Sequence, residues 1–157
     1  MDLKSLLDQE LITREPASAE EIHHLARLVD RDLKAHRAEG LPPDWQFAIA
    51  YGAALQLVTI IIRAEGFRAL AGAHHYATIE AFGAIAGEQY SDRVQYLQTC
   101  RGKRNRAEYD RAGEITRSEV ETLVDEAHEL KAWVAAWLGF HHPRLLPKTW
   151  RVSDGQA

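Results

Sequence analysis

The segment 45–65 constrains the fold most, because apolar side chains surround almost its whole circumference. Its polar side chains form only a narrow stripe at Gln56, Thr59 and Arg63. A helix of this kind must cover nearly all of its surface, so it belongs at the centre of a helical bundle or against a second subunit. Its most apolar stretch, 47–62, is shorter than the ~20 residues that a membrane span needs.

Two further segments combine helical periodicity with helix start signals. Ser18 and Glu21 have capping-box spacing, and apolar residues then recur every three or four positions. Thr116 and Glu119 have the same spacing before a regular apolar seam that ends at Gly139. The side chains that we expect in the core of these two helices and of the central one are Ile22, Leu25, Tyr51, Leu55, Val58, Ile62, Leu123, Leu130 and Val134.

The rest of the chain predicts shorter helices and no strand. Asp44 is expected to cap the central helix, and a short helix is expected to end at Gly87. We therefore predict an all-α fold, an antiparallel bundle of four or five helices without a sheet. Residues 16–140 form the bundle, 1–15 an N-terminal arm or short helix, and 141–157 a C-terminal tail that is partly disordered beyond Trp150.

Length, charge and cysteine usage limit the classes of protein to consider. At 157 residues the chain is long enough for one domain with its own core. A net charge of −4 argues against a general nucleic-acid coat. The single cysteine, Cys100, excludes an internal disulfide and a cysteine-based zinc site. The first residues lack the basic start and apolar core of a signal peptide, so we expect a cytoplasmic protein.

A basic run interrupts this acidic chain between residues 101 and 114. Five basic side chains stand there against three acidic ones, a local charge of +2. On a helix, Arg104 and Glu108, like Arg106 and Asp110, are four residues apart and could be surface ion pairs worth roughly 0.2–0.5 kcal/mol each. The run is therefore either a solvated surface or a site for an anion.

Within this run, Arg104-Asn105 followed by Tyr109 and Asp110 resembles the signature of HEPN domains (higher eukaryotes and prokaryotes nucleotide-binding). That signature is an arginine, a polar residue, and a histidine after a span of four to six residues. In this chain the position after four intervening residues is Tyr109, and the longer spacings fall on Asp110 and Arg111. A bundle of paired helices, with Gly72-Ala-His74-His75 at the start of a short one, is also the architecture of that family.

The resemblance implies a metal-independent ribonuclease in which the arginine holds the scissile phosphate and the histidine moves a proton. Arginine has a fixed charge and a fork of donors that suit phosphate. Tyrosine, with a reference pKa of about 10, is a poor general base at neutral pH. The resemblance thus assigns catalytic positions to Arg104, Asn105 and Tyr109, with Tyr109 the weak member. We expect no metal and no cofactor.

The ligand-binding residues that we predict around these positions are Arg101, Lys103, Arg106, His74 and His75. The two histidines stand at a helix start, where they could have a structural role, bind substrate or move a proton; no His-Glu-x-x-His spacing supports a metal role. They are the first candidates to replace the histidine of the signature. The resemblance also implies a homodimer and a nucleotidyltransferase-type partner in a toxin–antitoxin or defence locus.

Three functions are compatible with these residues. The chain could bind RNA or a phosphate-bearing ligand or partner with weak or no ribonuclease activity. It could be an active metal-independent endoribonuclease that uses Arg104 with a displaced histidine or Tyr109. It could also be a non-catalytic dimeric scaffold in which the basic run forms ion pairs.

Overall fold

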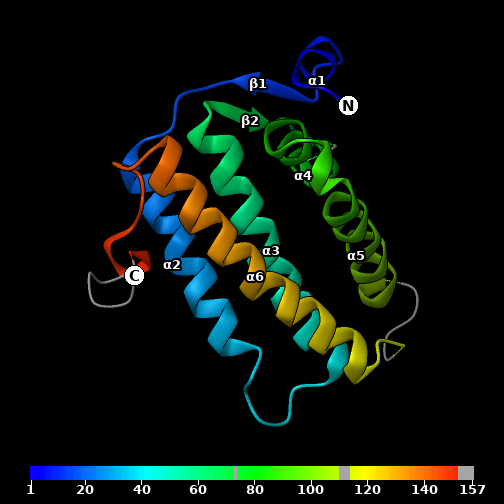
Figure 1. Cartoon of the computed structure of the whole chain (residues 1–157). Helices are drawn as coiled ribbons and strands as arrows, with labels where there is room; N and C mark the ends of the chain where they lie inside the picture. Colours follow the sequence, from blue (N-terminus) through cyan, green and yellow to red (C-terminus); the bar gives the residue numbers. More distant parts are fainter. Residues whose placement is uncertain (73, 110–113, 152–157) are drawn as a thin grey trace.

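The computed structural model describes residues 1–72, 74–109 and 114–151, with the backbone alone at 107–109. Helices account for most of these residues, which confirms the all-α class. The central helix is α3 (Pro43–Ala64), and α2 (Ala19–Ala35) and α6 (Arg117–His141) lie beside it. A pair of helices, α4 (His74–Ala86) and α5 (Ser91–Tyr109), packs against another side of α3 (Figure 1).

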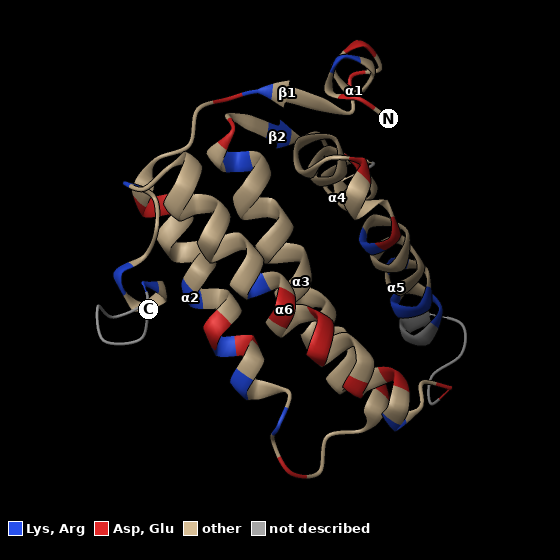
Figure 2. Cartoon of the chain, in the orientation of Figure 1, with Lys and Arg blue, Asp and Glu red and all other residues tan. Residues whose placement is uncertain are grey.

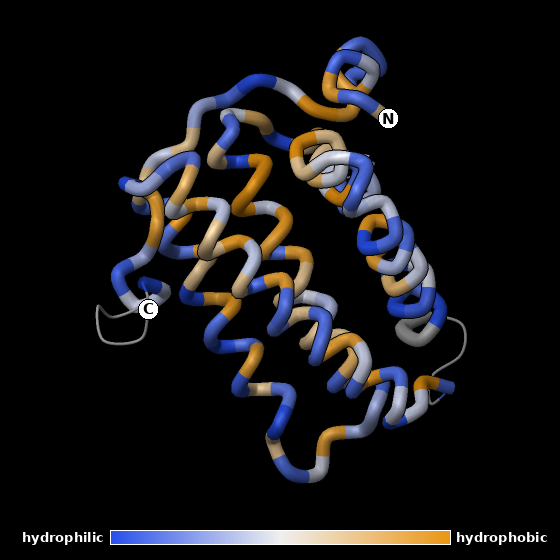
Figure 3. Tube along the Cα trace, viewed as in Figure 1, coloured by the Kyte–Doolittle hydropathy of each residue, from blue (hydrophilic) through white to orange (hydrophobic). Residues whose placement is uncertain are grey.

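The surface of α3 is covered by these four helices. Eleven of its 22 residues are buried, and apolar residues follow its whole length in Figure 3. The helix is long and apolar enough to cross a membrane, yet 61% of its most apolar window is buried inside the fold. Of the two arrangements that the sequence allowed for this helix, the structure has the centre of a bundle.

The predicted core is confirmed for most of its members. Leu25 and Leu55 are only partly buried, although both pack against the core. The other predicted side chains are buried: Ile22, Tyr51, Val58, Ile62, Leu123, Leu130 and Val134. Helix α6 continues through Gly139 to His141, so Gly139 does not end the helix as predicted. Leu138 is the last buried side chain of this seam.

Side-chain caps mark where the two helices beside α3, α2 and α6, begin. The hydroxyl of Ser18 accepts the backbone N–H of Glu21 at the start of α2. Thr116 and Glu119 cap α6 reciprocally, as the spacing predicts. Asp44 does not cap α3, because Pro43 is its first residue and the capping position is Pro42. A proline fits that first turn, where its missing N–H costs no hydrogen bond.

The prediction that the chain contains no sheet is wrong. Strands β1 (Ile12–Arg14) and β2 (Phe67–Ala69) pair in antiparallel register, with Thr13 opposite Arg68. Each strand has only three residues, which is too short for the alternation of apolar and polar residues that identifies a strand. The pair joins the segment after α1 (Leu3–Asp8) to the end of α3.

The buried guanidinium of Arg63 holds this junction together. Its side chain is 3% exposed and donates to the backbone carbonyls of Glu15 and Phe67, at 2.8 and 2.9 Å, and to the carboxylate of Glu21, at 2.9 Å. Arg68 bonds to Glu15 and Glu21 on the exposed side. One side chain from the end of α3 therefore fixes both strands and the first turn of α2.

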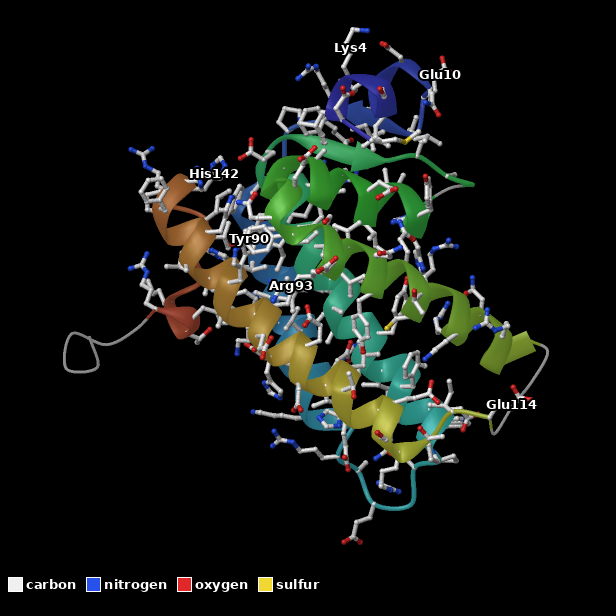
Figure 4. All side chains as sticks on the ribbon, turned by 45° about the vertical axis from the view of Figure 1, so that its right-hand side comes forward. Lys4, Glu10, Tyr90, Arg93, Glu114 and His142 are labelled. Carbon is white, nitrogen blue, oxygen red and sulfur yellow. The ribbon has the colours of Figure 1, made fainter. Side chains whose placement is uncertain are left out.

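Side chains at the start of α5 connect the α4–α5 pair to α6. Arg93, near the start of α5, donates to Glu126 of α6 (Figure 4). Its guanidinium lies over the ring of Tyr90, which ends the short 3₁₀ helix η1 (Glu88–Tyr90). The Tyr90 ring in turn contacts Trp133 of α6.

The C-terminal segment packs on the bundle as far as Trp150. This residue ends the 3₁₀ helix η2 (Lys148–Trp150), is buried, and donates its indole N–H to Asp30 at 3.0 Å. The predicted disorder beyond Trp150 concerns 152–157, which lie outside the described residues.

Candidate functional site

A small pocket lies where the start of α4 meets the second half of α5. Its volume is about 290 Å³. Four of the predicted site residues line it, together with Gly72 and Tyr76: His74, His75, Arg101 and Asn105. The histidines come from one helix and the arginine and amide from the next, so the fold brings together two groups that are separate in the sequence. We call this the histidine–arginine pocket.

The pairing of α4 with α5 creates the pocket. Gly83 lies so close to α5 that an added Cβ would be 2.7 Å from Cγ2 of Val94. At the other end of α4, Nε2 of Gln98 donates to the backbone carbonyl of Tyr76 at 3.2 Å. The helices are therefore antiparallel and in close contact, which places Arg101, one turn after Gln98, beside the first turn of α4.

Arg101 is held in place by two contacts. Its Nε donates to Oε1 of Gln98 at 2.9 Å, and its guanidinium carbon lies 5.7 Å from the ring centroid of Tyr76, within cation–π range. Its charge is fixed at any physiological pH. A guanidinium held at the edge of a pocket in this way is suited to an anionic group.

Arg104, the arginine of the signature, lies one step further from the pocket. Its guanidinium carbon is 5.7 Å from the ring centroid of Tyr51 on α3. The Tyr51 hydroxyl is 3.2 Å from Nδ1 of His75, and the two ring centroids are 5.8 Å apart. Tyr51 thus connects the arginine of the signature to one histidine of the pocket. Burial raises the pKa of Tyr51 to about 12, although the nearby charges of Arg104 and Arg101 act in the opposite direction.

Besides Arg104, two predicted residues with described side chains, Lys103 and Arg106, do not line the pocket. Lys103 pairs with Glu119 of α6 at 2.8 Å, and its ammonium group lowers the pKa of that carboxylate. Arg106 is exposed. Tyr109 is the last residue of α5, and its side chain lies outside the described part of the chain. The same is true of the side chains of Glu108 and Asp110, the expected ion-pair partners of Arg104 and Arg106.

Sequence reasoning missed the residues that position the site: Tyr51, Tyr76 and Gln98. Tyr51 was predicted only as a core residue, which it is. The available signal was its hydroxyl, since a buried hydroxyl in an apolar helix needs a hydrogen-bond partner. Gln98 precedes Arg101 by three residues, a spacing at which helical side chains meet. Nothing local in the sequence indicates which partner Tyr51 selects.

Four of the five Lys and Arg side chains of the α4–α5 pair lie in the second half of α5. Lys and Arg residues gather toward the C-terminal end of α5, opposite the acidic residues of α6 (Figure 2). The first turn of α4 adds the positive end of a helix dipole to the same place. On the other side of Gln98, a second cavity of about 630 Å³ is lined by the acidic side chains of Asp2, Glu80 and Glu88. An anion would therefore bind in the histidine–arginine pocket and not in the larger cavity.

The other histidines of the chain do not line this pocket. His142 lies 3.0 Å from a carboxylate oxygen of Glu65, His141 packs on Trp137, and His24 and His128 are exposed. Within the described residues, no three His, Cys, Asp or Glu side chains are grouped so that they could hold a metal ion.

No protein-family model, curated protein or solved structure matches the chain. The geometry of the histidine–arginine pocket is therefore the basis for a functional assignment.

Proposed function

We propose that this chain is a HEPN-like helical protein that binds RNA, or another phosphate-bearing ligand, in the histidine–arginine pocket. The observation that supports this most is the convergence of Arg101, Asn105, His74 and His75 on one cavity. Each of these side chains can donate hydrogen bonds to anionic oxygens, and Arg101 adds a permanent charge. The start of α4 favours an anion in the same place.

The proposed ligand class follows from the shape of this set of donors. A carboxylate holds its two oxygens in one plane, whereas the two non-bridging oxygens of a phosphodiester belong to a tetrahedral group and can accept from donors on two helices. An RNA strand would cross the pocket with one phosphate beside Arg101, while Arg106, exposed on the same helix, would face neighbouring phosphates. Lys103 contributes less, because Glu119 already neutralises it.

Replacing Arg101 with alanine is expected to weaken RNA binding by about 10- to 100-fold, the loss of one charge-assisted hydrogen bond of roughly 1.5–3 kcal/mol. Fluorescence anisotropy with a short labelled RNA measures this affinity, and a salt titration should show weaker binding as salt is added. Arg27→Ala, which removes the same charge from an exposed position on α2, is the matched control and should change affinity by less than about twofold. Equal effects of the two variants, or no binding at low salt, would reject the proposal.

The assembly that goes with this function is a homodimer in which two basic motifs face one ligand. This part of the proposal rests on the resemblance to HEPN domains, because α3 is covered within one chain and does not itself require a partner. A nucleotidyltransferase-type partner in a toxin–antitoxin or defence system, in the cytoplasm, belongs to the same proposal. Light scattering decides between the dimer and a monomer. A dimer that does not bind RNA would favour the scaffold alternative.

A metal-independent endoribonuclease is the second candidate, because His74 and His75 lie in the same pocket as Asn105 and Arg101. In that case His74 or His75 would replace the missing histidine of the signature. The test is cleavage of RNA by the purified protein in the presence of EDTA. Fragments that disappear with His74→Gln or His75→Gln, and with Arg104→Ala, would establish the enzyme.

A further inference from the structure

We propose that Tyr51 sets the tautomer of His75, so that His75 serves the pocket as a hydrogen-bond donor to an anion and not as a general base. The nature of the ligand rests on the proposed function, whereas the tautomer of His75 rests on the contact between the Tyr51 and His75 rings. Tyr51 acts through His75 and is therefore a positioning residue.

The direction of the hydrogen bond follows from the burial of Tyr51. This side chain is 1% exposed, and its hydroxyl lies 3.2 Å from Nδ1 of His75. Among the described residues, this is the one hydrogen bond of the Tyr51 hydroxyl. If Nδ1 carried the proton and donated, the hydroxyl hydrogen would be buried without an acceptor, at a cost of about 1–3 kcal/mol. The favoured arrangement has Tyr51 as donor and Nδ1 as acceptor.

Tyr51 cannot leave this arrangement by losing its proton. Its pKa is raised to about 12 by burial, so the hydroxyl remains protonated throughout the neutral range. The aromatic ring is also fixed, because it belongs to the buried face of α3 and carries Arg104 on its surface. The donor to Nδ1 is thus permanent.

The consequence for His75 concerns its second nitrogen. A neutral imidazole carries one proton, and an Nδ1 atom that accepts a hydrogen bond leaves that proton on Nε2. An Nε2–H group can donate to a phosphate oxygen beside Arg101. It has no lone pair with which to take a proton from a ribose hydroxyl, which a general base must do. His75 in this tautomer favours binding over cleavage.

Nuclear magnetic resonance of protein labelled with ¹⁵N at histidine tests the tautomer directly, at a pH where the His75 ring is neutral. Two-bond ¹H–¹⁵N spectra distinguish the two tautomers, and the His75 signals are assigned by their loss in His75→Gln. In the wild type we expect the Nε2–H form. In Tyr51→Phe, which keeps the ring beneath Arg104, we expect a mixture of both forms. Tyr96→Phe, which removes a hydroxyl from a residue that does not line the pocket, should leave the His75 signals unchanged.

The affinity for a short RNA provides the second readout. Tyr51→Phe should weaken binding by about two- to tenfold, the range for one hydrogen bond of 0.5–1.5 kcal/mol, and Tyr96→Phe should not. An Nδ1–H form in the wild type, or a Tyr51→Phe protein with unchanged tautomer and affinity, would overturn the inference. These results are separable from failure of the proposed function, which is judged by whether the wild type binds RNA and depends on Arg101.

Discussion

Replacing Arg63 with methionine is expected to lower the free energy of unfolding by about 3–5 kcal/mol, the cost of removing one partner from a buried ion pair. The guanidinium is 3% exposed and donates to the backbone carbonyls of Glu15, Pro16 and Phe67 and to the Glu21 carboxylate. Methionine fills much of the space but donates nothing, so the carbonyls of Glu15 and Phe67 and the Glu21 carboxylate all lose a donor. Urea denaturation followed by circular dichroism measures the change.

Arg68 provides the matched control, because it pairs with the carboxylates of Glu15 and Glu21, as Arg63 does, but from an exposed position. Its side chain is 47% exposed. Arg68→Met should cost less than about 1 kcal/mol, since solvent screens exposed ion pairs. If the two variants lose the same stability, the network is stabilised by charge alone and the backbone bonds of Arg63 contribute nothing.

The hydrogen bond between Arg63 and Glu21 also predicts that the free energy of unfolding depends on pH. The hydrogen bond from Arg63 holds the pKa of Glu21 below its ordinary value of 4.5. The ionised Glu21 carboxylate therefore contributes fully to stability when the pH is above 4.5, and this contribution decreases as the pH falls below 4.5. The wild type should lose this part of its stability in acid, whereas Arg63→Met, which has already lost it, should show a smaller acid dependence.

Replacing Leu130 with alanine is expected to cost about 2–5 kcal/mol, the range for a cavity left by a fully buried leucine. Leu130 is 0% exposed, and its helix α6 packs closely along α3. Leu25→Ala on α2 is the control of identical chemistry, because Leu25 is only partly buried and should cost about 1–2 kcal/mol. Urea denaturation measures both values, and the slope of the unfolding free energy against urea concentration should be the same in both variants as in the wild type. A smaller loss at Leu130 than at Leu25 would contradict the packing of α6 against α3.

Local sequence patterns are sufficient to predict the three long helices α2, α3 and α6. The apolar circumference of segment 45–65 identifies the central helix, because a helix without a broad polar face belongs in the interior. Ser18 and Thr116 identify two helix starts, because a cap bonds to an amide only a few residues away. These signals act over three or four residues and need no knowledge of the rest of the chain.

The small sheet and the end of α6 were outside the range of such signals. Strands β1 and β2 are about fifty residues apart, and their pairing depends on Arg63, a residue that the sequence placed on a polar stripe. Glycine is typical of helix ends, so the sequence predicts that α6 ends at Gly139, but the helix continues through it to His141.

At the site, residue types and spacing indicate which side chains to consider, and the packing of the helices selects those that meet. Arg101, Asn105, His74 and His75 were all named from their types and positions, but only the antiparallel contact of α4 with α5 places them around one pocket. Lys103 belongs to the same basic run, and its rotation around the helix axis directs it to Glu119 instead. The partner of Tyr51 was decided by packing alone, because a buried hydroxyl bonds to whichever group the neighbouring helix places within reach.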